Sequence, residues 1–120
     1  MLQVASTTKI YVALEPTDMR KGFAGLCGDV RQVLELDPLS GHLFLFRNRR
    51  RDRIKILLWD GDGFAIYYKR LERGTFELPR AIKGNGKIEI RASELAMILD
   101  GIRLAGRTRR ERFELAAAST

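Results

Sequence analysis

The residues of this chain that are best suited to specific chemistry are arginines, and most of them fall into two clusters. Residues 47–55 hold six cations and one acid, and residues 103–112 hold five arginines and one acid. A guanidinium can bind a phosphate through two parallel hydrogen bonds and can also stack on a flat ring. Sixteen of the 22 cations are arginine, so the pattern favours nucleic acid as a partner. An acidic protein surface is the alternative partner.

The first cluster lies on an expected hairpin whose strands also carry aromatic residues that could stack on bases. Phosphate contacts are predicted for Arg47, Arg49, Arg50, Arg51 and Arg53, with Lys55 and Lys69 in support. Trp59 and Tyr67 are the stacking candidates. Arg20 and Lys21 stand at an expected helix start, where backbone amides could add a phosphate site. The alternative for the hairpin is a solvated turn that prevents edge pairing.

Other kinds of chemistry have weaker support in the sequence. One His and one Cys cannot supply a zinc shell, and no Gly-x-Ser-x-Gly motif is present. The segment Asp60-Gly61-Asp62-Gly63 lacks the glutamate that completes a calcium loop, because Leu71 occupies that position. We therefore predict a hairpin turn there, with no metal, no cofactor and no catalytic residue. A nuclease in which Asp60 and Asp62 converge with a third carboxylate is the less favoured alternative.

Length and composition fit one soluble domain. The chain has 120 residues, 45% of them hydrophobic, and a net charge of +7. Its one cysteine excludes an internal disulfide and fits a reducing compartment, so a cytoplasmic location is expected. No apolar run approaches the roughly 20 residues of a membrane span, and no membrane partner is expected. We predict a flexible N-terminus over residues 1–8, a domain over 9–102 and a basic, flexible tail over 103–120.

The first half of the domain is expected to contain a strand and then a long helix. Alternating apolar residues predict the strand over 10–14, and the helix should run over 19–36 with Thr17 or Asp18 as its N-cap. Six apolar positions form one helical stripe, namely Phe23, Leu26, Cys27, Val30, Val33 and Leu34. Three glycines spaced three apart predict close packing of this helix on a sheet, namely Gly22, Gly25 and Gly28.

The second half of the domain is expected to begin with an antiparallel meander. Its strands cover 42–47, 53–59 and 64–70, and a five-residue turn would pair Arg47 with Arg53. That register puts Ile54, Ile56 and Leu58 on one face with Phe44, Phe46, Phe64, Ile66 and Tyr68. Lys55, Leu57, Trp59 and Tyr67 then lie on the opposite face with Leu43 and Leu45.

A short strand at 76–78, a strand over 87–91 and a short helix capped by Ser93 should follow the meander. The fold class is therefore α+β. An antiparallel sheet of four to six strands carries one long helix after the first strand and a short helix near the C-terminus.

Three segments of the chain resemble a known family. They are Thr17-Asp18-Met19-Arg20-Lys21-Gly22-Phe23, then Ser40 to Arg50, and then Lys55 to Phe64 continuing into Tyr68 to Gly74. They are similar to signatures of the TnpB accessory proteins of the insertion-sequence-66 family, the product of that element's second open reading frame. The resemblance implies a bacterial mobile-element protein that assists a separate, larger transposase. Ala24 departs from the acidic residue expected there, and the tail lies outside the motifs.

Together these features predict a non-catalytic accessory protein for DNA transposition. The expected partner is DNA, with the ends of the element as the favoured target. The element's transposase and a second accessory protein are further candidate partners. In the alternative hypothesis the chain is an interaction module that docks the transposase without binding DNA. That hypothesis predicts an exposed apolar patch formed by Leu43, Leu45, Leu57, Trp59 and Tyr67 and ringed by arginine.

Overall fold

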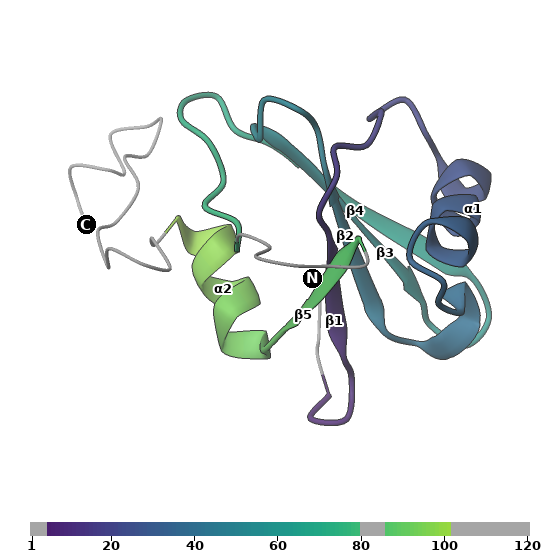
Figure 1. The fold of residues 1–120 in the computed structure, drawn as a ribbon. Coiled ribbons are helices and arrows are strands. Elements are labelled where there is room, and N and C mark those ends of the chain that lie inside the picture. The colour runs from purple at the N-terminus through teal and green to yellow at the C-terminus, as the bar shows by residue number, and fades with distance from the viewer. Residues whose placement is uncertain (1–4, 80–85, 102–120) are drawn as a thin grey trace.

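The computed structural model describes residues 5–79 and 86–101, and these residues form a sheet with helices on its two faces (Figure 1). The α+β class is confirmed, and the five strands fall within the predicted four to six. In chain order the elements are β1 (Ile10–Ala13), α1 (Phe23–Gln32), the 3₁₀ helix η1 (Pro38–Ser40), β2 (Leu43–Arg47), β3 (Arg53–Trp59), β4 (Phe64–Arg70), β5 (Lys87–Ile90) and α2 (Ala92–Asp100).

The sheet is mixed, which corrects the prediction of a purely antiparallel one. Its strand order is β4-β3-β2-β1-β5. β1 and β2 are parallel, with Tyr11 opposite Phe44, whereas the other neighbours are antiparallel. The physical reason is the connection between them, because α1 returns the chain to the starting end of the sheet before β2 begins. Sequence alternation identifies a strand but not the direction of a partner that lies thirty residues away.

Both faces of the sheet are buried. On one face α1 packs through Leu26, Val30 and Leu34 against strand residues that include Phe44 and Phe46. On the other face α2 contributes two residues to a second cluster, which contains Ile10, Val12, Leu43, Leu45, Ile54, Ile56, Phe76, Ile90, Leu95 and Ile98. The two burial surfaces explain why the apolar residues of β2 form a continuous run instead of alternating with polar ones.

The predicted register of the first hairpin is wrong by one residue. Arg47 pairs with Ile54, so six residues separate the paired positions instead of five. The backbone N–H of Asn48 donates to the carbonyl of Arg53 at 3.1 Å, and Arg51 adopts a left-handed conformation with φ of 62°. This left-handed residue absorbs the additional step in the turn.

The register shift exchanges the two faces of β3. Ile54 and Ile56 join the cluster beneath α2, whereas Leu57 joins the cluster beneath α1. Phe64 and Ile66 of β4 share the α1 face with Phe44 and Phe46, as predicted. The predicted faces are therefore correct for β2 and β4 and reversed for β3.

The helix α1 begins later than predicted. It starts at Phe23 with Gly22 as an N-cap that makes no side-chain hydrogen bond, so neither Thr17 nor Asp18 caps it. Phe23 and Val33 are each 50% exposed and do not belong to the buried stripe. A Cβ built on Gly22 would meet nothing within 4 Å, so close packing on the sheet does not explain this glycine.

The other two helix glycines also lie away from the sheet. A Cβ on Gly28 would meet nothing within 4 Å, and the atoms nearest to one on Gly25 would be those of the Lys21 side chain, beginning at 3.0 Å. The interpretation of the glycine spacing as close packing on the sheet is wrong. Gly25 leaves room for the Lys21 side chain, and the described residues give no packing reason for Gly28.

The last elements differ from prediction at their ends. Residues 76–78 form no strand, although Phe76 is fully buried. The strand predicted over 87–91 is confirmed as β5. α2 begins at Ala92, where the Glu94 carboxylate accepts a 2.8 Å hydrogen bond from the Arg91 N–H, so Ser93 is not the cap. The basic tail predicted over 103–120 lies outside the described residues.

Two phenylalanines test this assignment of the core. We expect Phe76→Ala to lower the free energy of unfolding by about 3 to 5 kcal/mol, because it empties a fully buried site. The matched control is Phe23→Ala, which removes the same ring from a half-exposed position and should cost about 1 kcal/mol or less. Urea denaturation of both variants gives the comparison. Equal losses would contradict the assignment.

Candidate nucleic-acid interface

The centre of the candidate site is the turn between β2 and β3, residues 48–53, which we call the arginine turn. The Asn48 side chain organises it. Its Oδ1 accepts hydrogen bonds from the backbone N–H groups of Asp52 at 3.1 Å and Arg53 at 3.0 Å, and its Nδ2 donates to Asp52 Oδ1 at 2.6 Å. The Arg51 N–H donates to the Asn48 carbonyl at 3.2 Å and closes the first bend. The Asn48 side chain thus accepts the hydrogen bonds of turn N–H groups that have no partner in the β2–β3 ladder.

Neighbouring segments hold the arginine turn from both sides. The Phe76 N–H donates to the Arg51 carbonyl at 2.7 Å, and the Leu71 N–H donates to the Asp52 carbonyl at 2.8 Å. On the other side, the Thr17 N–H donates to the Arg47 carbonyl at 2.7 Å. The turn is therefore a fixed platform, anchored by a fully buried phenylalanine, rather than a free loop tip.

Arg49, Arg50 and Arg51 project from this platform into solvent. None of the three has a carboxylate partner among the residues that the structure describes. The nearby Asp52 is held as an anion, because the hydrogen bond from Asn48 lowers its pKa and Arg50 and Arg53 add to that effect. Three adjacent cations repel one another, so an incoming anion would relieve that repulsion.

Arg47 has a different role from its three neighbours. Its Nη2 donates to the Leu14 carbonyl at 2.6 Å, which ties β2 to the segment after β1. Burial lowers its pKa, and the charges of Arg51 and Arg49 lower it further. Arg47 and Arg51 border a groove of about 450 Å³. The remaining lining residues are Val12, Ala13, Leu14, Glu15, Leu78 and Pro79.

An aromatic residue that the sequence analysis did not select lies next to Arg53. Tyr68 is 48% exposed, and its hydroxyl accepts a 3.3 Å hydrogen bond from Arg53 Nη1. The ammonium of Lys55 lies 4.7 Å from the centre of the same ring. Tyr68 could have been selected only with the correct register between β3 and β4, because the observed register, unlike the predicted one, places Lys55 opposite Tyr68.

Lys55 itself is an internal residue. The residue is only 9% exposed, and its Nζ donates to the Lys21 carbonyl at 2.8 Å. This bond ties β3 to the segment that enters α1. Lys69 is similar, since its Nζ donates to the Leu99 carbonyl of α2 at 3.3 Å. Both ammonium groups are thus engaged in contacts between elements of the fold.

Trp59 and Tyr67 lie on opposite faces of the sheet, so the predicted grouping of both with the arginines is wrong. Trp59 packs edge-on against Phe64, with 5.0 Å between ring centres, at the opposite end of β3 from the arginine turn. Six residues of extended chain separate it from Arg53, which is about 20 Å. Tyr67 packs against the buried cluster beneath α2. Neither ring is placed to stack beside the arginine turn.

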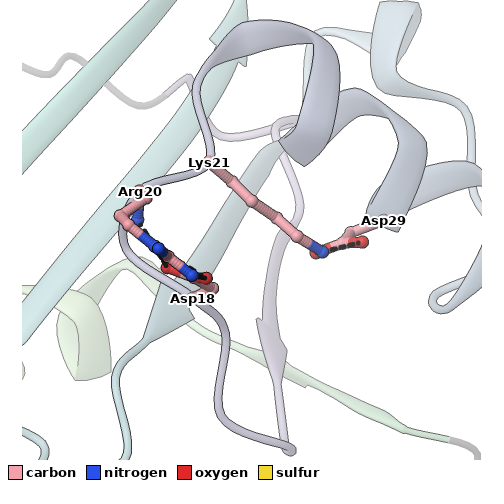
Figure 2. A network of polar contacts seen from close by, with 4 residues as sticks. All are labelled: Asp18, Arg20, Lys21 and Asp29. Carbon is pink, nitrogen blue, oxygen red and sulfur yellow. Dashed lines mark hydrogen bonds and ion pairs between the residues drawn. The ribbon is translucent and has the colours of Figure 1, made fainter.

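Arg20 and Lys21 are each paired with a carboxylate. Figure 2 shows Arg20 lying along Asp18, with Nη2 at 2.7 Å from Oδ2, and Lys21 reaching Asp29 of α1 at 2.9 Å. The side-chain hydrogen bond from Arg20 lowers the pKa of Asp18 to about 2, with its backbone N–H contributing. Two compact ion pairs therefore occupy the predicted phosphate site at the helix start.

Comparison with known proteins identifies the family. The family model described as IS66 Orf2 like protein matches residues 8–109, which is most of the chain. The chain belongs to this family. The match confirms the resemblance carried by the three sequence segments, and it implies an accessory role in the transposition of an insertion sequence.

Two relatives of this IS66 Orf2-like chain come from Sinorhizobium fredii. The uncharacterized protein y4hO is 40% identical over 102 residues, covering 85% of this chain and 87% of the relative. The uncharacterized protein y4jC is 36% identical over 94 residues, covering 78% and 79% respectively. No solved structure matches the chain significantly.

The alternatives considered for this IS66 Orf2-like chain find no counterpart in the described residues. The apolar patch expected of a docking module does not form, because Leu43, Leu45 and Leu57 are fully buried. Within the described ranges no three metal-binding side chains gather, Asp60 and Asp62 included. No helix in those ranges is long and apolar enough to cross a membrane.

The Asp18–Arg20 pair of this IS66 Orf2-like chain predicts a measurable titration. In Arg20→Ala the Asp18 pKa should rise from about 2 towards 3.8 but stay below it, since the residue 20 N–H still donates. Because the folded-state pKa is depressed, ionised Asp18 stabilises the fold above pH 3.8, and this contribution is lost as pH falls towards 2. Carboxyl carbon shifts measured by NMR follow the titration. An unchanged pKa would contradict the assigned ion pair.

Replacing Asn48 should lower the stability of the fold, whereas replacing its neighbour Arg49 should not. Asn48→Ala leaves two turn N–H groups without their acceptor and should lower the free energy of unfolding by about 1 to 3 kcal/mol. Arg49→Ala is the control, because its side chain is exposed, and it should stay within about 0.5 kcal/mol. Chemical denaturation of both variants measures the difference. An Asn48→Ala protein as stable as the control would overturn this role.

Proposed function

We propose that this protein is a non-catalytic transposition accessory that binds the phosphate backbone of DNA through the arginine turn. The observation that carries the proposal is the state of Arg49, Arg50 and Arg51. They are consecutive, exposed and without carboxylate partners in the described residues. Most other predicted site cations have an internal partner, whether a carbonyl, a phenol or a carboxylate.

The rigidity of the arginine turn supports the same proposal. Two backbone hydrogen bonds from neighbouring segments hold it and a third holds the adjoining Arg47, so little ordering is required when a ligand binds. The exposed ring of Tyr68, held beside Arg53, gives the surface a stacking element at one side. We therefore add Tyr68 to the interface in place of Trp59 and Tyr67.

The family provides the setting for this activity. An accessory role in transposition makes the ends of the element the expected DNA and the cytoplasm the expected location. The transposase and a second accessory protein are the expected protein partners. Docking on the transposase without DNA is the second candidate function. The apolar patch that it predicts is not supported, because Leu43, Leu45 and Leu57 are buried, although the same exposed arginines could bind an acidic surface.

The test is a salt titration of DNA binding by fluorescence anisotropy with the full chain. The probes are an element-end duplex, a scrambled duplex and a single strand. The logarithm of the association constant should fall linearly with the logarithm of salt concentration. Replacing Arg49, Arg50 and Arg51 by Ala should reduce that slope by about 2 to 3 and weaken all probes alike.

A charge-matched control separates a local site from general attraction. Lys9→Ala, Arg31→Ala and Arg91→Ala together remove the same charge from exposed positions outside the arginine turn. This variant should retain nearly the wild-type slope. Equal losses in the two triple variants would contradict a local site. Absence of binding by the wild type at about 0.1 M salt would overturn DNA binding and favour the transposase as the partner.

A further inference from the structure

The outer edge of β4 is an open pairing surface in the described part of the chain. β4 is the terminal strand of the sheet and pairs only with β3. It is seven residues long and contains neither proline nor a bulge, and both of these are common devices against edge pairing. The other terminal strand, β5, has only four residues.

The hydrogen bonds of the β3–β4 hairpin fix which backbone groups of β4 point outward. The Asp60 N–H donates to the Gly63 carbonyl and the Leu71 N–H donates to the Asp52 carbonyl, and hydrogen-bonded pairs alternate along the ladder between them. The backbone N–H and C=O groups of Ala65, Tyr67 and Lys69 therefore point toward β3. The outward N–H and C=O groups belong to Phe64, Ile66, Tyr68 and Arg70.

The side chains of these same four residues lie on the α1 face and are incompletely covered. Phe64 and Ile66 are half-buried at the margin of the α1 cluster, and Tyr68 is among the most exposed large hydrophobic residues. Arg70 lies at the end of the strand and forms a 3.1 Å ion pair with Glu72, in which both side chains are about half exposed. A strand added at this edge would cover the three apolar side chains.

We propose that β4 pairs with β4 of a second copy of this chain, antiparallel about a two-fold axis at Ile66, to form a ten-stranded sheet. Charge and apolar side chains match across the two copies in one register. With Ile66 opposite Ile66, Phe64 lies opposite Tyr68 of the second copy. Asp62, in the turn before β4, then lies beside Arg70 of the second copy and adds a second carboxylate to that guanidinium.

Other registers with the same hydrogen-bonding parity lack part of this match. Pairing about Tyr67 would set Arg70 against Phe64, and pairing about Tyr68 would set it against Ile66, so neither gives the guanidinium an acid on the second copy. Pairing about Ala65 would set Arg70 against Asp60, but it would also set the ring of Tyr68 against Asp62. In a chain with a net charge of +7, the favoured register is the one that adds an acid opposite Arg70 and also pairs the apolar side chains with one another.

Cysteine cross-linking tests the register directly. In an H-bonded antiparallel pair the Cα atoms are about 5.5 Å apart, a separation that suits a disulfide. The native Cys27 is buried, and we remove it by Cys27→Ala. In that background, Ile66→Cys should give a covalent dimer on oxidation with oxidised glutathione, whereas the control Tyr68→Cys should not. Cross-linking of the Tyr68→Cys variant instead of the Ile66→Cys variant would overturn the register.

Sedimentation equilibrium of the unmodified chain tests the association itself. Two paired edge strands form a small interface, so we expect a reversible dimer that becomes detectable as the protein concentration rises to about 500 µM. Asp62→Arg or Arg70→Asp alone should weaken it about tenfold, and the double variant Asp62→Arg/Arg70→Asp should restore it.

Two results would overturn the proposal. One is a wild-type chain that stays monomeric over this range, and the other is a dimer that is indifferent to both charge changes. The exposed positions of Asp62 and Arg70 keep these variants folded, which circular dichroism checks. DNA binding plays no part in either readout, so this test is independent of the proposed function.

Discussion

The hydrogen bonds of one side chain, Asn48, set the arrangement of the rest of the molecule. By accepting from the N–H groups of Asp52 and Arg53, its carboxamide closes a turn in which six residues separate paired positions. The length of this turn fixes the register of β3 against β2, and that register decides which face receives each β3 side chain. Lys55 meets the start of α1 for this reason, and Tyr68 of β4 comes to lie beside Arg53 and Lys55. The same turn carries Arg49, Arg50 and Arg51, so the register of the sheet and the placement of these charges have one origin.

Most strand boundaries could be predicted from the sequence, whereas the register could not. β3 and β4 have the bounds that alternation and turn residues predicted, and β2 differs by one residue. Alternation fails as a guide to register when both faces of a strand are buried, because Ile54 and Leu57 then suit either face equally. The parallel pairing of β1 with β2 also depends on a distant partner, which no local pattern encodes. Composition identified the arginine turn, but the pairing of Arg20 and Lys21 with carboxylates and the burial of Lys55 arise only from tertiary contacts.

Some cations among the described residues make hydrogen bonds that hold the fold together, whereas others have side chains exposed to solvent. Arg47, Lys55 and Lys69 each donate to a backbone carbonyl of another segment. The positive charge of the donor strengthens each of these hydrogen bonds. These contacts tie β2, β3 and β4 to the segments beside them. A simple count of basic residues therefore overstates the surface available to an anion. The consecutive arginines of the turn differ because their side chains are exposed, and at Arg51 it is the backbone that bonds to Asn48 and Phe76.

Burial of both sheet faces limits where this fold can meet a partner. With α1 on one face and α2 on the other, the sheet itself can meet a partner only at its ends or along its edges (Figure 1). The arginine turn lies at one end of the β2–β3 hairpin, and the outer edge of β4 is one strand away from it. Because Arg53 pairs with Arg70, the turn lies at the C-terminal end of β4. A two-fold axis at Ile66 would place two such turns at opposite ends of the joined sheet. An extended ligand such as duplex DNA could reach both turns only if it followed the length of those strands. The geometry of the edge thus constrains the geometry of any DNA complex, and Tyr68, which lies beside Arg53 and on the outer edge of β4, belongs to both surfaces.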